Sequence, residues 1–246
     1  MPSVSTRAIL SLSKRPVLLT LIGSAMTLAT AVASASIVIS EVDPAGSASG
    51  SGYSEDWFEL TNTGSSAVTI SGWKMDDSAD SFAAATALSI AGGASSIAAG
   101  QSIVFLEGSY SATADANFIA QWFGSGGAPA TLTLGNYGAH GLSQSGDAVN
   151  IYNSSGALIT NVTFGASSLT SGTFDNTAGL SGAIATYSSV GVNGAFTSGK
   201  GEIGSPGIDT AVAPVPLPAS AWLLLASVGI LTPFSRRKSA PGKRPA

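Results

Sequence analysis

The chain has 246 residues, of which 44% are hydrophobic and only 10% are charged, and it contains no cysteine. This excludes disulfide bridges, thiolate catalysis and cysteine-based zinc sites. All 14 acidic residues lie between Glu41 and Asp209, where Lys74 and Lys200 are the only lysine or arginine residues. Two positive and fourteen negative charges give this region a net charge of −12. Such a charge repels the phosphate backbone, so the region is not expected to bind nucleic acid.

The N-terminal segment has the pattern of a secretory signal peptide. Residues 1–15 carry three basic side chains, and residues 17–32 form an uncharged, mainly apolar run. Ala33 and Ala35 then supply the small side chains that a signal peptidase accepts. We predict cleavage after Ala35, with an uncleaved anchor helix as the alternative.

The central region is predicted to be all-β. Short β-branched and aromatic segments are separated by Gly, Asn, Ser and Asp at turn positions. The expected strands are residues 37–42, 57–62, 68–70, 102–106, 131–134, 147–152 and 157–164. Only residues 114–123 have weak helical spacing. We therefore predict a β-sandwich over residues 36–209, in which residues 166–200 form an extra hairpin or a long loop.

Acidic residues flank the first two expected strands. Glu41 and Asp43 end the first strand, and Glu55 and Asp56 precede the second. These four residues are expected to meet at one end of the sandwich. Calcium takes about six to eight oxygen ligands, and two such loops supply several of them. The alternative is a solvated acidic rim that keeps a weakly charged protein soluble.

The second expected strand carries a carboxylate at its centre. Glu59 shares a face with Trp57 and Thr61, because alternate residues of a strand point the same way. We expect this to be an outer face on which Glu59 pairs with Lys74. Trp57 and Trp73 lie in strand motifs and are expected in the core.

A second calcium hypothesis concerns the segment after Trp73. Asp76, Ser78 and Asp80 have the spacing that begins a calcium-binding loop. The remainder of that loop is missing, since Ser81 stands where glycine is required and Ala87 where a bidentate glutamate is required. Calcium is thus the only cofactor that the sequence suggests.

The single histidine is the obvious candidate for catalysis. His140 lies near Ser143, Ser145 and Asp147, but the chain has no Gly-x-Ser-x-Gly motif to expose a nucleophilic serine. A His-based zinc or two-metal hydrolase site normally needs more than one imidazole. We therefore expect His140 in an exposed turn and predict no catalytic residues.

The C-terminal segment has three parts. A proline-rich spacer with Pro216 and Pro218 precedes an apolar stretch at residues 219–234, and a basic cluster with Arg236 and Arg237 follows. As a helix, the apolar stretch is about 24 Å long, slightly less than the thickness of a bilayer core. The basic cluster favours the cytoplasmic side of a membrane.

Residues 214–238 resemble the PEP-CTERM sorting signal, in which a Pro-x-Pro motif, a helix and arginines follow in order. The resemblance implies processing by an exosortase near the Pro-x-Pro motif. Leu217 stands where that motif has glutamate, which leaves the cleavage point open. A permanent single-span anchor is the alternative. In either case residues 210–246 form a spacer, a membrane helix and a basic tail.

The body resembles the lamin-tail domain, an immunoglobulin-like β-sandwich. The resemblance rests on the order of segments at residues 39–42, 56–62, 68–73, 97–101 and 145–152, and on the end of the region at residues 201–207. It extends over about residues 36–209, and implies an accessory or interaction module.

Together these features predict a non-catalytic, exported protein of the cell envelope or extracellular matrix. Its expected partners are the signal peptidase, an exosortase-type enzyme, and an exopolysaccharide or another surface protein. A secreted metal-dependent hydrolase or a calcium-binding module is the alternative. Fold alone does not decide between them.

Overall fold

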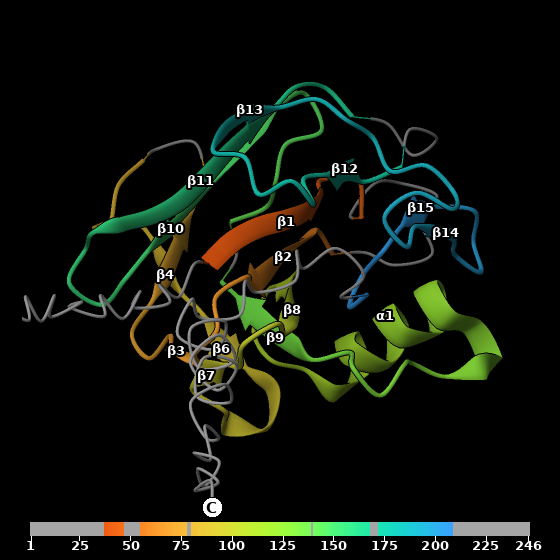
Figure 1. Cartoon of the computed structure of the whole chain (residues 1–246), viewed down its shortest axis with the longest axis horizontal. Coiled ribbons are helices and arrows are strands. Elements are labelled where there is room, and N and C mark those ends of the chain that lie inside the picture. The colour runs from red at the N-terminus through yellow and green to blue at the C-terminus, as the bar shows by residue number, and fades with distance from the viewer. Residues whose placement is uncertain (1–36, 47–54, 78–79, 139, 168–171, 209–246) are drawn as a thin grey trace, which may run out of the picture.

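The computed structural model describes residues 37–46, 55–77, 80–138, 140–167 and 172–208 (Figure 1). The predicted signal peptide and sorting tail, with Ala33, Ala35, Pro216, Pro218, Arg236 and Arg237, lie outside these ranges, as does Ser78. Within the described ranges, every helix is too short or too polar to cross a bilayer.

Two sheets form the body. The first has the order β12-β1-β2-β8-β9-β6 and the second has the order β13-β11-β10-β4-β5. The first sheet consists of β1 (Ile37–Asp43), β2 (Trp57–Asn62), β6 (Ser89–Ile90), β8 (Ser102–Glu107), β9 (Leu134–Tyr137) and β12 (Phe174–Asp175). The second consists of β4 (Lys74–Asp76), β5 (Thr86–Ala87), β10 (Asp147–Tyr152), β11 (Leu158–Phe164) and β13 (Gly182–Ile184).

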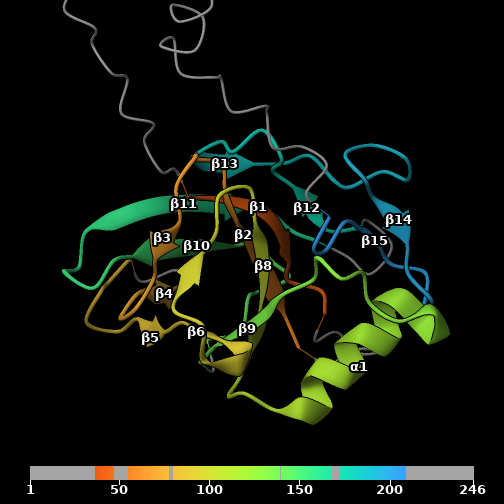
Figure 2. The same cartoon turned by 60° about the horizontal axis from the view of Figure 1, so that its bottom comes forward.

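The smaller elements lie at the periphery of these sheets. Two-stranded pairs join β3 (Val68–Thr69) to β7 (Ser96–Ile97) and β14 (Phe196–Thr197) to β15 (Ile203–Gly204). The helix α1 spans Ala112–Phe123, and 3₁₀ turns occur at η1 (Ala91–Gly93) and η2 (Gly124–Gly126). Figure 2 shows α1 and the β14–β15 pair on the same side of the first sheet.

The main core lies between the two sheets. Alternate residues of β2 and β8 point toward the second sheet, and Phe58 and Phe105 stack with ring centroids 5.5 Å apart. Val149 and Val162 of the second sheet belong to the same fully buried cluster. Trp73 is also part of this core, as predicted.

A second core lies on the outer face of the first sheet. There Trp57 packs edge-on against Trp122 of α1, with centroids 5.5 Å apart. Ser111 caps α1 by accepting a hydrogen bond from the amide of Ala114. Trp57 is therefore buried as predicted, although it contacts the helix instead of the second sheet.

One strand is displaced from its predicted position. The pattern favours a strand at residues 131–134, whereas β9 begins at Leu134. The amide of Leu132 donates to the carbonyl of Pro129 at 3.0 Å, so this stretch forms a turn. Parallel pairing with β8 then begins with Val104 opposite Leu134.

Candidate functional site

Three carboxyl groups form what we call the buried carboxyl cluster, consisting of Glu41, Asp43 and Glu59. Antiparallel pairing of β1 with β2 sets Glu41 opposite Glu59. A register shift between Ile39 and Glu41 marks a bulge in β1. Bulges redirect side chains, and here Ser40 as well as Glu41 faces Glu59 on the outer side of the sheet.

Glu41 is enclosed by hydrogen-bond donors from the C-terminal third of the body. Its Oε1 accepts from the hydroxyl of Thr173 and, at 2.9 Å, from the amide of Ser205. Its Oε2 accepts from the hydroxyl of Ser205 at 3.1 Å. Burial, and then the neighbouring charge of Glu59, raise the pKa of Glu41 well above its ordinary value.

Glu59 is buried, contrary to the predicted exposed pair with Lys74. It accepts hydrogen bonds from the hydroxyl of Ser40 at 2.7 Å and from the amide of Gly207 at 2.6 Å. Lys74 belongs to the other sheet, where its Nζ lies 4.6 Å from the ring centroid of Phe82. The outer face of β2 is covered because residues 204–207 lie across it.

Asp43 completes the buried carboxyl cluster. It accepts a hydrogen bond from the amide of Ala45 at 3.0 Å. Burial, with a smaller contribution from the charge of Glu202, raises the pKa of Asp43 to about 8. The charges of Asp56 and Glu41 act in the same direction, so these acids lie near one another at one end of the sandwich.

The donors around this cluster indicate a structural role. Hydroxyl and amide donors of the protein already occupy the oxygens of Glu41, and an amide engages Asp43, which leaves few ligand positions for a calcium ion. Calcium binding by Glu41 and Asp43 therefore stays a prediction that this geometry does not favour.

A second acidic group lies at the end of β4 and has a different character. Asp76, Asp77 and His140 each offer a ligand atom, and these atoms all lie within 4.8 Å of one another. The Nδ1 of His140 is 3.7 Å from Oδ2 of Asp77. We call these three residues the Asp–His cluster. Asp76 was predicted as a ligand from the sequence, whereas His140 and Asp77 were not.

Asp80 is engaged elsewhere. It accepts a hydrogen bond from the hydroxyl of Tyr152. Burial, and then this hydrogen bond, raise the pKa of Tyr152 to about 12. The predicted spacing of Asp76 and Asp80 thus brings both residues near the end of β4, but it does not place Asp80 in the Asp–His cluster.

His140, Ser143, Ser145 and Asp147 do not have the geometry of a serine catalytic triad. Asp147 accepts a hydrogen bond from the backbone amide of Ser143 at 2.8 Å, which fixes a turn. The hydroxyl of Ser143 accepts from the amide of Ser145 at 3.1 Å. His140 contacts Asp77 of another strand end, so it does not bridge Ser143 and Asp147.

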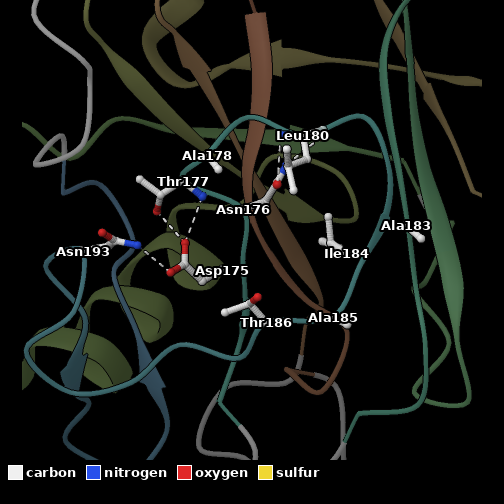
Figure 3. Close-up of a pocket in the computed structure, with 10 residues that line it drawn as sticks. All are labelled: Asp175, Asn176, Thr177, Ala178, Leu180, Ala183, Ile184, Ala185, Thr186 and Asn193. Atoms are coloured by element: carbon white, nitrogen blue, oxygen red, sulfur yellow. Dashed lines mark hydrogen bonds between the residues drawn. The ribbon is translucent and has the colours of Figure 1, made fainter.

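A pocket of about 370 Å³ lies on the surface after β12 (Figure 3). It is lined by Asp175, Asn176, Thr177, Ala178, Leu180, Ala183, Ile184, Ala185, Thr186 and Asn193. Asp175 accepts hydrogen bonds from Thr177 and, at 2.7 Å, from the side-chain amide of Asn193. Figure 3 shows these polar groups on one side and Ile184 and Ala183 on the other, so the pocket is amphipathic.

The family follows from sequence comparison. The Lamin Tail Domain family matches residues 30–166, which is more than half of the chain, so the chain belongs to this family. The mostly β-strand body with one short helix agrees with the all-β, immunoglobulin-like fold of that family. Such domains are binding or structural modules and are not a known catalytic family. No curated protein matches the sequence.

Proposed function

We propose that this protein is a non-catalytic binding or structural module that works outside the cytoplasmic membrane, at the cell surface or in a secreted polysaccharide matrix. The observation that carries the proposal is the buried carboxyl cluster. Its acids are held by hydroxyl and amide donors of the same chain, such as Thr173 and Ser205, and so they support the fold. Membership of the Lamin Tail Domain family agrees with this role.

Export and sorting are the second part of the proposal. Residues 1–35 act as a signal peptide, and residues 219–234 hold the chain in the membrane until, or unless, an exosortase cuts near Pro216 and Pro218. Intact-mass spectrometry of the native extracellular protein tests this. We expect a chain that begins near Ser36 and ends near Pro214. Untrimmed full-length chain in the cytosol would contradict the proposal.

The partner that we propose is an exopolysaccharide, bound in the pocket of Figure 3. Its polar groups on Asp175, Thr177 and Asn193 lie across the pocket from the apolar Ile184 and Ala183, a combination that suits a sugar ring. Binding of the mature protein to a glycan array is the test. Ala178→Trp, which fills the pocket from an exposed position, should abolish binding, and Ser155→Ala in the β10–β11 turn is the matched control.

The rival function is a metal-dependent hydrolase, and the Asp–His cluster is the observation that favours it. Incubation of the mature protein with nuclease, phosphatase and glycosidase substrates, in calcium and in magnesium, separates the two. We expect no turnover. Turnover that needs the metal and disappears in Asp76→Asn would favour the hydrolase.

A further inference from the structure

We propose that Asp76, Asp77 and His140 form a binding site for a divalent transition-metal ion, with Zn²⁺ as the best-fitting probe. The site is independent of the sorting signals and of the sugar pocket. It also differs from the calcium loop expected from the spacing of Asp76, Ser78 and Asp80, because its third ligand comes from a distant loop.

The backbone holds the three side chains in place from both sides. Asp76 is the last residue of β4 and pairs with Asn150 of β10. The side-chain amide of Asn150 donates to the carbonyl oxygen of Asp77 at 2.5 Å, which fixes the residue after the strand. On the opposite side, the amide of His140 donates to the carbonyl of Gly138 at 2.8 Å.

The loop that carries His140 is also anchored beyond the histidine. The amide of Gly138 donates to the hydroxyl of Thr86 at 3.2 Å, and the amide of Leu142 donates to the carboxylate of Asp56 at 2.8 Å. A site with ligands on two anchored segments needs little ordering when an ion binds, and this lowers the free-energy cost of binding.

The distances suit a single ion. Zinc–nitrogen and zinc–oxygen bonds are about 2.0–2.2 Å long, so two ligand atoms on one ion stand about 3–4 Å apart. Nδ1 of His140 and Oδ2 of Asp77 are already at 3.7 Å. All three ligand atoms lie within 4.8 Å, so a side-chain adjustment of less than 1 Å brings the third into range.

A buried, unpartnered oxygen is the independent sign of a ligand. Asp76 is fully buried, and its Oδ2 accepts from the amide of Ser81 at 2.8 Å, whereas its Oδ1 has no hydrogen-bond partner among the residues that the structure describes. A buried carboxylate oxygen without a donor is costly. Asp76 offers a carboxylate oxygen within 4.8 Å of the ligand atoms of Asp77 and His140, so a cation bound there would stabilise this buried carboxylate.

The ligand set selects the kind of ion. Calcium and magnesium prefer sets made entirely of oxygen, whereas imidazole favours zinc and its neighbours in the first transition row. Asp77 and His140 are about one quarter exposed, with side-chain values of 23% and 28%, so water has access to complete the coordination shell. The set has one imidazole, fewer than the two or three typical of His-based catalytic zinc sites, but its three ligands leave a fourth position for water, as such sites do.

The test is titration of the mature protein, carrying no polyhistidine tag, with Zn²⁺ by calorimetry and NMR. The chain has a single histidine, so its imidazole signals belong to His140 without further assignment. We expect one zinc per chain and a shift of those signals. Asp76→Asn and His140→Ala should each weaken binding by at least about tenfold, whereas Asp115→Asn on α1, an equal change of charge, should leave it unchanged.

Three results would overturn the site. They are His140 signals that do not move with zinc, equal zinc affinity in His140→Ala, and calcium binding that depends on Asp76 but leaves His140 unaffected. His140→Ala serves as the second variant, because it removes a ligand of the site without changing the buried Asp76. Its side chain is partly exposed, and circular dichroism before titration checks that it folds.

Discussion

The two acidic groups of this protein have similar residues but opposite surroundings. Glu41 in the buried carboxyl cluster receives hydrogen bonds from Thr173, Ser188 and Ser205. Asp76 in the Asp–His cluster is equally buried, yet one of its oxygens has no partner in the described part of the chain. Burial alone therefore does not decide what a carboxyl group does. Its hydrogen-bond donors also matter: a carboxyl group with several donors stabilises the fold, whereas one with an unpartnered oxygen is suited to bind a cation.

The largest loss of stability should come from removing the indole ring that packs beside the buried carboxyl cluster. Trp122 contacts Trp57 and Phe196 and lies against Gly204, next to Glu41. Trp122→Ala should lower the free energy of unfolding by about 3–5 kcal/mol. Urea denaturation of the mature protein measures it. Tyr110→Ala, at a residue 59% exposed, is the control. An equal loss of stability in this variant would contradict the role given to the packing of Trp122.

The pH dependence of stability should follow the buried carboxyl cluster. Native Asp43 keeps its proton up to a pH of about 8, whereas the unfolded chain loses it near 3.8, so the native state binds more protons between these values. The contribution of Asp43 to stability should therefore fall as pH rises from about 4 to 8, by up to about 1.4 kcal/mol per pH unit, and then level off, with Glu41 acting in the same direction. Thermal unfolding across this range measures the slope, which should become shallower in Asp43→Asn.

Removing one hydrogen-bond donor from the buried carboxyl cluster should lower the free energy of unfolding by a smaller amount. Thr173→Val keeps the shape of the buried side chain and deletes the hydroxyl that serves Glu41. The cost should be about 1–3 kcal/mol, because one of the hydrogen bonds to a buried carboxyl group is lost. Chemical denaturation measures the change, with Thr173→Ser as the variant that keeps the hydroxyl. A loss in the serine variant as large as in the valine variant would point to packing instead.

A substitution in the Asp–His cluster should have the smallest effect on stability, and this effect should be an increase. Without metal, Asp76→Asn should raise the free energy of unfolding by about 1 kcal/mol, because it removes a buried charge that only the Ser81 amide satisfies among the described residues. Asp147→Asn should lower it slightly, since Asp147 accepts from the amide of Ser143. Thermal unfolding in a chelator measures both. A clear loss of stability in Asp76→Asn would mean that Asp76 stabilises the fold, as Glu41 does in the buried carboxyl cluster.

Local patterns in the sequence were sufficient for the longest strands, whereas the short strands β4–β7 and β12–β15 were not predicted. The alternation at residues 57–62 and 147–152 corresponds to β2 and β10. The strand expected at residues 131–134 was misplaced because its hydrophobic pattern does not reveal the turn at Pro129. The position of Glu59 on an outer face followed from alternation, but its burial did not.

The sites depend on contacts between distant parts of the chain. The donors to Glu41 come from Thr173, Ser188 and Ser205, more than 130 residues away. His140 follows β9 of the first sheet and Asp77 follows β4 of the second, so their contact at 3.7 Å joins segments that are 63 residues apart in the sequence. The one signal that could have suggested the Asp–His cluster was the presence of a single histidine in a glycine-rich loop.

The strand pairing has a practical consequence for the length of the folding unit. The family match ends at residue 166, yet β12 pairs with β1, β13 pairs with β11, and the amide of Gly207 donates to Glu59. A recombinant fragment trimmed to the matched region would leave strand edges and acidic side chains uncovered and would be prone to aggregate. Expression boundaries should therefore extend through residue 208.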